Sequence, residues 1–565
     1  MTLHSRADTM TRTAAPAARS AAQVLVDQLR IQGVRHVFCV PGESYLAVLD
    51  ALYDSGIDVI VCRNEGGASM MAEAYGKATG RPGICFVTRG PGATNGSGGI
   101  HIAQQDSTPM ILFVGQVETH NRGRDAFQEM NYRDFFGGMA KWVAEIDEPD
   151  RMAEHVGRAF ATAMAGRPGP VVLSLPHDVL PRPSASKDVP YIEPAEPAPG
   201  PEQMAALEGL LARSEKPMLI LGGSRWDDNA LAAMARFAER FGVPVATSFR
   251  RAHHFDPLHP NYAGDLGLAV NPKLLARVKG ADLVIAAGAR LSEFTAQGYT
   301  LFDIPVPQMT FVHAYPGAEE LGRIYQPHLP IHASPRAFAA ALDALRPART
   351  HDVTAEHQAY LDWSDKGTDQ PGPVNISRIM LWLRAHLPDD AIITNGAGNY
   401  AGWIHRFYRF RRFNTQLGTI CGFMGYGMPA AVAMKRLYPE RTVVAVNGDG
   451  DFLMNGQELA TAVQYGIPII ALVLDNGMLG TIRMHQEREY PGRVSATTLV
   501  NPDFAAMARS FGGFGATVEK TADFAPAFRE AQESGLPSVI HVKFDGDGIS
   551  PVNTLTAIRK KALGG

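Results

Sequence analysis

The sequence predicts an α/β protein built from three doubly wound parallel-sheet domains in series. Short apolar runs alternate with amphipathic helical stretches along the chain, which is typical of parallel strands covered by helices on both faces. Two breaks in composition interrupt this alternation. Residues 181–201 carry seven prolines in twenty-one positions, and residues 362–373 are polar with Gly and Pro, so both segments are expected to be linkers.

The two linkers divide the 565 residues into domains at 20–182, 202–350 and 374–550, each of ordinary length. Each domain contains short apolar runs without polar alternation, as strands buried on both faces have. The expected strands are residues 36–40, 59–62, 84–87 and 110–114 in the first domain, 218–221 and 283–287 in the second, and 392–394, 442–446 and 467–474 in the third.

Composition narrows the range of functions. The chain is 45% hydrophobic and 19% charged with a formal net charge of −4, which fits a globular protein and gives no sign of a nucleic-acid partner. No apolar run approaches the roughly 18 residues of a membrane span. The four cysteines are widely spaced, so we expect buried thiols in a reducing compartment, with the cytoplasm as the default location. The first twenty residues lack an apolar signal core and are expected to be an irregular extension.

The most informative motif begins at Gly448 and reads Gly-Asp-Gly-Asp-Phe, and Asn476 follows 27 residues after Asp449. Gly-Asp-Gly alone is usually a turn, so the prediction depends on the apolar strands that precede Gly448 and Asn476. Parallel strands bring their carboxyl ends to one edge of the sheet, where Asp449 and Asn476 can meet. Their oxygens suit Mg²⁺ or Ca²⁺, and Gly448 and Gly450 let the backbone approach a phosphate. The segment therefore predicts a divalent metal that holds a diphosphate.

This segment resembles the signature of thiamine-diphosphate enzymes, and the likeness runs from about Ala21 to Phe544. The resemblance implies thiamine diphosphate and Mg²⁺ as cofactors, a first domain that binds the pyrimidine, and a third that binds the diphosphate and metal. It also implies the main-chain carbonyl of Met478 as third protein ligand of the metal. The residues implied to contact the cofactor are Glu65, Gly396, Asn399, Met424, Gly448, Gly450, Asp451, Met478, Leu479 and Gly480.

Glu65 is the predicted catalytic carboxylate. It lies in a turn between a strand that ends at Cys62 and a helix that runs to about Thr79, with Gly80 as its stop. From the residues alone, Glu65 could simply favour a helix N-terminus. The resemblance implies instead that it hydrogen-bonds N1′ of the aminopyrimidine. A buried carboxyl group with a raised pKa can share a proton with N1′ and so favour the imino tautomer that removes the C2 proton.

Other segments resemble acetohydroxyacid synthases more than pyruvate decarboxylases. Gln128 matches a glutamine that reaches the synthases' active site from the partner subunit; otherwise it is a solvated loop residue. Met424 matches the residue that holds the cofactor in its V shape; otherwise it is a core methionine. Two positions depart from the pattern, because His485 stands where the synthases carry tryptophan and Phe294 where they carry an acceptor-binding arginine. His485 is interpreted either as a proton donor near the cofactor or as a space-filling replacement.

The middle domain gives weaker signals. Residues 219–224 form a strand that ends in two glycines, a possible nucleotide turn, and related enzymes bind FAD, an ADP moiety or nothing there. FAD is therefore possible but not favoured. The pair His253 and His254 has no third ligand at a recognisable spacing, so a surface loop is predicted rather than a metal site.

The resemblance implies an acetolactate-synthase-like enzyme that decarboxylates a 2-keto acid such as pyruvate and joins the remainder to a second carbonyl. Three alternatives stay open: a 2-keto acid decarboxylase that releases an aldehyde, a lyase of 2-hydroxyacyl-CoA or hydroxyketones, and a non-catalytic thiamine-diphosphate-binding protein. Glu65 argues against the last, since binding alone needs no proton relay. The resemblance also implies a homodimer or homotetramer, with the active site at the subunit interface.

Overall fold

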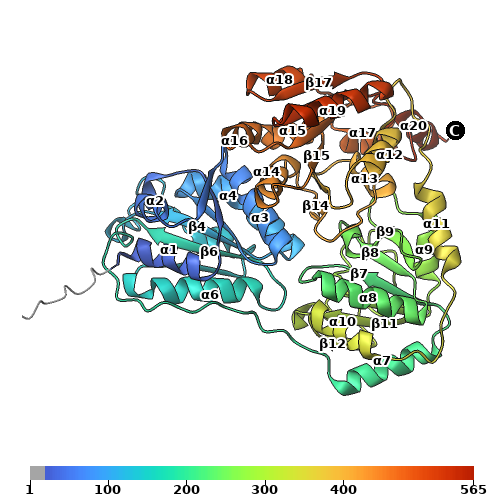
Figure 1. Cartoon of the computed structure of the whole chain (residues 1–565), viewed down its shortest axis with the longest axis horizontal. Coiled ribbons are helices and arrows are strands. Elements are labelled where there is room, and N and C mark those ends of the chain that lie inside the picture. Colours follow the sequence, from blue (N-terminus) through green and yellow to red (C-terminus); the bar gives the residue numbers. More distant parts are fainter. Residues whose placement is uncertain (1–18, 565) are drawn as a thin grey trace, which may run out of the picture.

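The computed structural model describes residues 19–564 and contains three six-stranded sheets whose strands are all parallel. This confirms the predicted α/β class, with helices and strands alternating along the chain (Figure 1). Most of the extension expected over the first twenty residues lies outside the described residues. Between residues 19 and 564, no helix is both long enough and apolar enough to cross a membrane.

The first sheet has the strand order β2-β1-β3-β4-β6-β5. Its expected strands are confirmed, and two further strands complete it. The elements are α1 (Ala21–Ile31), β1 (His36–Cys39), α2 (Leu46–Tyr53), β2 (Asp58–Val61), α3 (Glu65–Thr79), β3 (Gly83–Val87), α4 (Gly90–Asp106), β4 (Met110–Gln116), α5 (Tyr132–Phe136), β5 (Trp142–Glu145), α6 (Met152–Met164) and β6 (Pro170–Pro176).

The central sheet has the order β12-β11-β10-β7-β8-β9, so the strand order reverses between β7 and β10. Residues 185–200, within the first predicted linker, form no helix or strand. The elements are α7 (Pro201–Arg213), β7 (Pro217–Leu221), α8 (Asp228–Phe241), β8 (Val245–Ser248), β9 (Tyr262–Leu266), α9 (Pro272–Lys279), β10 (Leu283–Ala287), β11 (Thr310–Tyr315), β12 (Leu329–His332), α10 (Pro335–Ala344) and α11 (Thr354–Ser364).

Helix α11 differs from the sequence prediction, which places a linker from residue 362 and ends the central domain at 350. The helix continues to Ser364 and packs on β9 and α9, so it belongs with the central sheet. Asn271 donates to the carbonyl of Ala359, and the ring of Tyr360 meets that of Tyr262 edge-on at 4.8 Å. These contacts cannot be foreseen from the polar composition of the segment, because only two of its residues are buried.

The third sheet has the order β14-β13-β15-β16-β18-β17, with β13, β15 and β16 side by side at its centre. All three of its expected strands are confirmed. The elements are α12 (Ile376–His386), β13 (Ile392–Asn395), α13 (Ala401–Phe407), β14 (Gln416–Gly418), α14 (Gly427–Leu437), β15 (Val443–Gly448), α15 (Asp449–Asn455), α16 (Leu459–Gln464), β16 (Ile470–Asp475), α17 (Gly480–Glu489), α18 (Phe504–Ser510), β17 (Phe514–Val518), α19 (Phe524–Ser534), β18 (Ser538–Lys543) and α20 (Leu555–Ala562).

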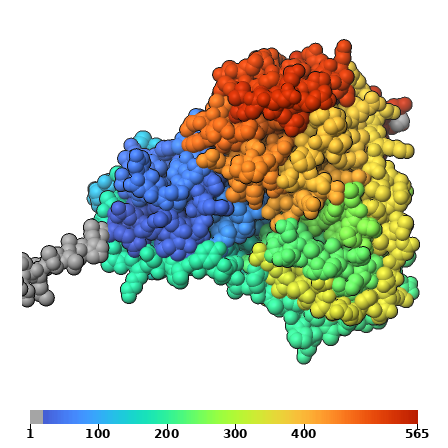
Figure 2. Space-filling view, viewed as in Figure 1, coloured from blue at the N-terminus to red at the C-terminus, as the bar shows by residue number. Residues whose placement is uncertain are grey.

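The first and third domains share one continuous core, because α3 packs against α14. A buried polar cluster lies within this contact: Lys77 donates to Asp106 at 2.6 Å, and the hydroxyl of Tyr426 donates to Glu73 at 2.7 Å. Figure 2 shows the orange residues of the third domain directly against the blue first domain. Buried hydrogen-bonded groups of this kind fix the orientation of packed elements, since a misaligned partner leaves a buried charge unsatisfied.

Helix α3 lies unusually close to strand β3 because Gly83 has no side chain. A β-carbon on Gly83 would lie 1.8 Å from the carbonyl oxygen of Ala72 in α3. The helix begins with Asn64, whose side chain accepts from the Gly66 N–H, and ends at Gly80 in the left-handed region at φ +68°, as the sequence predicts.

We expect Gly83→Ala to lower the free energy of unfolding by about 1–3 kcal/mol, because α3 must move away from the sheet. Urea denaturation followed by circular dichroism measures this loss. The matched control is Gly209→Ala in α7, where a β-carbon would meet only the flexible end of Arg213. That change should be neutral or stabilising by up to about 1 kcal/mol. Equal effects of the two substitutions would contradict the close contact.

Candidate active site

The predicted metal–diphosphate residues meet at the carboxyl edge of the third sheet. Strands β15 and β16 pair directly, so Asp449 at the end of one lies beside Asn476 at the end of the other. The main-chain N–H of Met478 donates to Asp449 Oδ2 at 3.2 Å, which fixes the loop after β16 against the loop after β15. The structure thus places Asp449, Asn476 and Met478 in one cluster.

Asp449 is almost fully buried, and its two oxygens have different surroundings. Oδ2 accepts from the Met478 N–H and, at 2.7 Å, from the Asn501 amide. Among residues 19–564, the donor to Oδ1 is the adjacent Gly450 N–H at 2.9 Å, so this oxygen has a further lone pair that could bind a cation. Burial raises the pKa of Asp449, and a bound cation would offset that cost of the ionised form.

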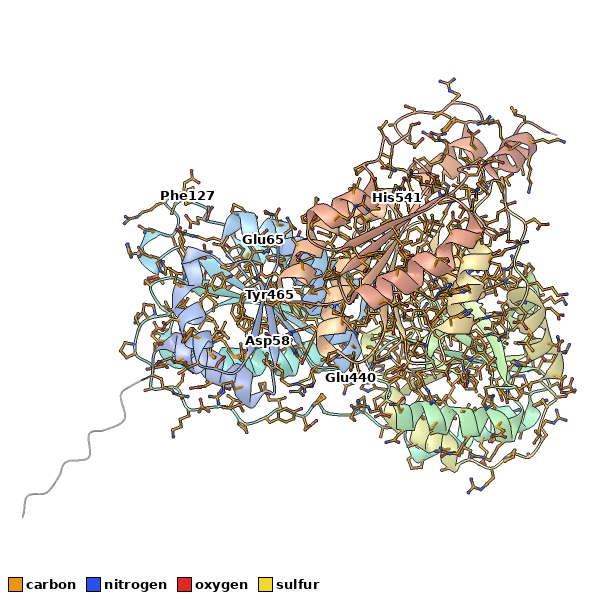
Figure 3. The ribbon with its side chains drawn as sticks, turned by 45° about the horizontal axis from the view of Figure 1, so that its top comes forward. Asp58, Glu65, Phe127, Glu440, Tyr465 and His541 are labelled. Atoms are coloured by element: carbon orange, nitrogen blue, oxygen red, sulfur yellow. The ribbon has the colours of Figure 1, made fainter. Side chains whose placement is uncertain are left out.

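Asn501 is a site residue that sequence reasoning missed. Its Nδ2 donates both to Asp449 Oδ2 and to Asp475 Oδ1, each at 2.7 Å, so one amide bridges two carboxylates that would otherwise repel. His541, labelled in Figure 3, contacts the other oxygen of Asp475 at 2.8 Å. Although burial acts to raise the pKa of Asp475, hydrogen bonds from His541, Gly477 and Asn501 lower it. No spacing in the sequence links these residues, because the contact forms only after β16 and β18 pair.

The donor set fits a small, hard cation. Among residues 19–564, no group of three or more His, Cys, Asp or Glu side chains could hold a metal ion. A metal here would therefore rely on one carboxylate oxygen from Asp449, the side-chain oxygen of Asn476 and the carbonyl of Met478. Mg²⁺ is commonly held by one or two carboxylates together with phosphates and waters, so this set fits it.

The loop after β13 is held by Asp451, which the sequence predicts as a cofactor contact. Its carboxylate accepts from the N–H of Ala397 at 3.1 Å, the N–H of Gly425 at 2.8 Å and the hydroxyl of Tyr400 at 2.7 Å. Burial raises the pKa of Asp451 to about 6. A β-carbon on Gly396 would lie 2.1 Å from Asp451 Oδ1, so only glycine fits there. The carboxylate of Asp451 therefore points into the protein, where it holds the loop after β13 in place.

Asn399 joins this loop to helix α17. Its N–H donates to the hydroxyl of Thr481 at 3.0 Å, and that hydroxyl donates back to Asn399 Oδ1 at 3.0 Å. The amide nitrogen of Asn399 lies 3.5 Å from the sulfur of Met484. Thr481 and Met484, which the sequence did not single out, thus contact the predicted cofactor residue, whereas the neighbouring His485 does not.

Three predicted cofactor residues form an apolar wall next to Asp449. A β-carbon on Gly450 would lie 2.8 Å from Leu479 Cδ2 and 3.7 Å from Met424 Cε, so these side chains close around the glycine. Gly480 directly follows Leu479, and a β-carbon on it would lie 3.2 Å from Asn476 Nδ2. The glycines keep the backbone open beside the carboxylate, and the apolar residues offer a surface for a ring.

Glu65 is the first residue of α3, and its carboxylate accepts from Asn95 at 3.0 Å. The turn before it is fixed from the third domain, because the N–H groups of Arg63 and Asn64 each donate to the buried carboxylate of Glu458 at 3.1 Å. Within the described residues, no hydrogen bond or ion pair joins the Glu65 side chain to Asp449 or its loops. Figure 3 shows Glu65 on the first domain and His541 within the third.

Gln128 and His485 are not brought to the metal cluster within one chain. Gln128 lies in a loop at φ +64° next to Phe127, which is 74% exposed and projects from the first domain in Figure 3. His485 is exposed on α17, and its hydrogen-bond partner in the described part of the chain is Arg488 at 3.5 Å. The catalytic roles expected for Gln128 and His485 therefore stay predictions.

Comparison with known proteins identifies the family. Residues 19–135 match the N-terminal thiamine pyrophosphate-binding domain of thiamine pyrophosphate enzymes, residues 204–342 their central domain, and residues 396–542 their C-terminal thiamine pyrophosphate-binding domain. The chain belongs to the thiamine pyrophosphate enzymes. It is an enzyme of the acetolactate synthase type, and thiamine diphosphate is its cofactor.

Curated relatives of this thiamine pyrophosphate enzyme are acetolactate synthase subunits. The large subunit of Escherichia coli isozyme 2 is 33% identical over 93% of this chain and 95% of its own length. The large subunit from Corynebacterium glutamicum is 32% identical over 92% of this chain and 86% of the relative. A probable large subunit from Methanocaldococcus jannaschii is 31% identical over 93% and 92%.

The central sheet has a crevice of the kind at which open α/β sheets bind dinucleotides, because its strand order reverses between β7 and β10. The predicted glycine turn lies there: the carbonyls of Gly222 and Gly223 accept from Trp226 and Arg251, each at 2.8 Å. A β-carbon on Gly223 would lie 1.9 Å from the Gly288 oxygen, so the turn requires glycine. Gly223 and Trp226 also line a cavity. That FAD is possible but not favoured in this domain stays a prediction.

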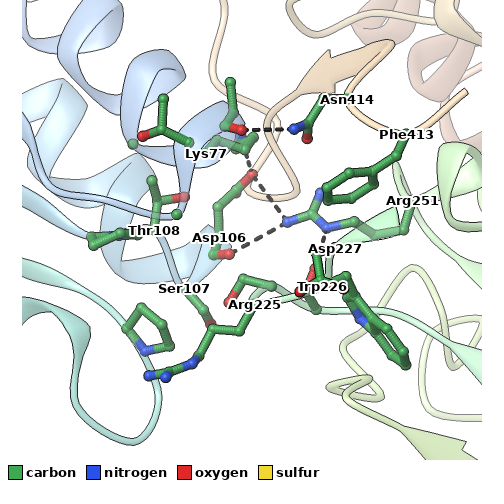
Figure 4. A pocket seen from close by; sticks show the side chains of 18 of the residues that line it. Lys77, Asp106, Ser107, Thr108, Arg225, Trp226, Asp227, Arg251, Phe413 and Asn414 are labelled. Carbon is green, nitrogen blue, oxygen red and sulfur yellow. Dashed lines mark hydrogen bonds and ion pairs between the residues drawn. The ribbon is translucent and has the colours of Figure 1, made fainter. Parts of the chain in front are cut away.

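The prediction that His253 and His254 form a surface loop is wrong. Both are buried, and their rings stack at 4.7 Å. They line a cavity of about 240 Å³ at the junction of the three domains, where Arg251 reaches toward Asp106 (Figure 4). This burial has no local signal in the sequence, because the loop is polar and its cover comes from distant residues, among them Trp226 of the central domain and Phe413 of the third.

We expect Asn501→Ala to weaken Mg²⁺-dependent binding of thiamine diphosphate by about tenfold or more, as loss of a residue that orients a metal ligand does. Isothermal titration of the apo protein with thiamine diphosphate at varied Mg²⁺ measures the change, and excess chelator should abolish binding to the parent protein. Asn121→Ala, which removes a surface hydrogen bond to Glu118, is the control. Unaltered Mg²⁺ dependence in Asn501→Ala would show that the bridge does not position Asp449.

Proposed function

We propose that the protein is a Mg²⁺-dependent carboligase that decarboxylates a 2-keto acid such as pyruvate and joins the two-carbon remainder to a second carbonyl compound. The observation that carries this proposal is the cluster of Asp449, Asn476 and Met478 at one sheet edge, with Asp449 Oδ1 left open for a cation. The acetolactate synthase names of the relatives support the same reaction type.

The residues present fit the cofactor and the metal. Asp449, the side-chain oxygen of Asn476 and the carbonyl of Met478 would hold Mg²⁺, and the loop around Gly396 would hold the diphosphate. Met424 and Leu479 would support the rings. When bound, thiamine diphosphate supplies a thiazolium that accepts the electron pair released as CO₂ leaves the keto acid. The protein's tasks are to orient this group, exclude water and move one proton.

Glu65 is proposed to move that proton. Its position at the first turn of α3, held by Asn95 and by the Glu458 clamp on the preceding turn, gives the carboxylate a fixed direction. A carboxyl group placed on N1′ of the pyrimidine can exchange a proton with it, which a glutamine cannot do. With the cofactor bound, proton exchange at N1′ would activate the 4′-amino group, on the opposite side of the pyrimidine ring, as a base.

A specific observation favours a simple 2-keto acid decarboxylase as the second candidate. Phe294 is 44% exposed and stacks on the buried ring of Phe249 at 4.8 Å. At position 294 this surface offers an aromatic ring in place of a cationic side chain, which suits an apolar group better than the carboxylate of a second keto acid. Without a second carbonyl compound, a proton would take the place of the CO₂ that leaves the keto acid, and an aldehyde would be released.

We propose that the active site forms between two copies of the chain. The described residues of one chain complete a metal cluster on the third domain, but no hydrogen bond joins Glu65 to it. Gln128 lies in the same domain as Glu65, next to the exposed ring of Phe127. A homodimer is then the smallest active unit, and a tetramer is compatible with it.

We expect Glu65→Gln to lower turnover by about 10²–10⁴-fold while thiamine diphosphate still binds, because only the proton transfer is removed. Pyruvate consumption with added cofactor and Mg²⁺, with products identified by mass, measures it. Glu43→Gln, an exposed carboxylate of the same domain, is the control. Acetolactate supports the carboligase, and acetaldehyde supports the decarboxylase. Full turnover by Glu65→Gln would exclude both mechanisms.

Mixing two inactive variants tests the shared site. Glu65→Gln and Asp449→Asn are each expected to be inactive alone. After random re-pairing of subunits, half the dimers carry one copy of each variant and one intact site, so about a quarter of the parent activity should return if a two-fold dimer shares its sites. No recovery, with mixed dimers demonstrated by native mass spectrometry, would place Glu65 and Asp449 in the same chain's site.

A further inference from the structure

Arg250 reaches from the central domain into the third domain. There it contacts the loop of residues 396–400, which is proposed to hold the diphosphate, and the residue before it. It follows β8 in the left-handed region at φ +59° and is only 2% exposed. Its guanidinium donates to the carbonyl of Gly396 at 2.7 Å and to that of Asn395 at 3.2 Å. A β-carbon on Gly418 would lie 2.0 Å from Arg250 Nη1, so β14 has no side chain where the guanidinium lies.

The positive charge of Arg250 has no carboxylate beside it. Within the described residues Arg250 takes part in no ion pair, and its buried Nε has no hydrogen-bond partner. Burial lowers the pKa of Arg250, with Tyr400, Asp106 and Asp451 acting in the other direction, yet an arginine stays protonated. A buried charge is costly unless an opposite charge compensates it, so this position calls for an anion.

The loop of residues 395–397 lies between the Arg250 guanidinium and the side on which the cofactor is proposed to bind, so it can carry the electrostatic influence of Arg250 to that side. The carbonyls of Asn395 and Gly396 face Arg250, while the N–H of Ala397 faces Asp451. In a trans peptide the oxygen and the hydrogen point in opposite directions, so the N–H of Gly396 points away from the guanidinium. Arg250 therefore aligns a peptide dipole toward the side on which a phosphate would lie, and adds its own positive charge behind it.

We propose that Arg250 is a positioning residue for the cofactor's diphosphate, which supplies the counter-charge that the buried guanidinium lacks. This inference rests on the proposed diphosphate site at the loop of residues 396–400. It also ties the central domain to cofactor binding, because β8 of that domain delivers the charge. The central domain then contributes to the active site through Arg250.

Arg251 provides an internal comparison. It is also buried, at 5% exposure, and it also donates to main-chain carbonyls, those of Gly223 and Arg250, at 2.8 Å. Its guanidinium lies 3.9 Å from the Asp106 carboxylate and faces the junction cavity (Figure 4). The two adjacent arginines thus share burial and chemistry but differ in whether a carboxylate compensates the charge.

The test measures the binding of the cofactor and of pyrophosphate, and it does not depend on turnover. Apo protein is titrated calorimetrically with thiamine diphosphate and, separately, with inorganic pyrophosphate, both with Mg²⁺, for the parent, Arg250→Lys, Arg250→Gln and Arg251→Gln. We expect Arg250→Gln to bind both anions about tenfold more weakly or worse, as loss of one charge–charge interaction at a buried site predicts. Arg250→Lys keeps the charge and should stay within about threefold of the parent. Arg251→Gln should bind both anions as the parent does.

Thermal unfolding of each apo variant shows whether it folds. If Arg250→Gln does not fold, Arg250→Lys decides the question, since a tenfold loss there would overturn the role of the charge. Parent-like binding by Arg250→Gln, or an equal loss in Arg251→Gln, overturns the inference while leaving the proposed function intact. Failure of the parent protein to bind thiamine diphosphate with Mg²⁺ would overturn the proposed function itself, and this inference with it.

Discussion

The cofactor edge of the third domain depends on two buried carboxylates placed two residues apart at the start of α15. Successive residues of a helix are turned by about 100°, so Asp449 and Asp451 point to opposite sides. Asp449 binds the loop after β16 through Met478, and Asp451 binds the loop after β13 through Ala397. One helical turn thereby fixes both neighbouring loops. The arrangement needs three strands that end at the same edge, which a parallel sheet with β15 at its centre provides.

The other two domains act on this edge through buried polar groups. Glu458 of the third domain holds the turn before Glu65, and Arg250 of the central domain holds the carbonyls before Gly396. Each contact links residues far apart in the chain and is satisfied only in one orientation of the domains. Such contacts cost desolvation energy, but they give the site a fixed geometry, on which orientation of a cofactor depends.

The cofactor side and the substrate side of the site differ in how closely they follow the family. In the third domain, residues that resemble the cofactor motifs hold the loops after β13 and β16 through Asp451 and Asp449. The positions that set the acceptor in the synthases carry Phe294, which forms an aromatic surface, and His485, which is exposed on α17. This difference is the reason why the proposed function keeps open whether a second carbonyl compound takes part. Fold and family alone do not determine that choice, because specificity lies in individual side chains.

The sequence by itself determined the α/β class, the expected strands, helix α3 with its stop at Gly80, and the meeting of Asp449 with Asn476. These follow from local patterns: apolar run length, glycine at a left-handed position, and the rule that parallel strands end at one edge. Only the tertiary structure revealed Asn501 bridging two carboxylates, the Asp451 carboxylate pointing into the protein, the burial of His253 and His254, and Arg250 on the carbonyls of Asn395 and Gly396. Each of these depends on residues brought together from distant segments, and a polar residue in a loop carries no local signal of whether another domain will cover it.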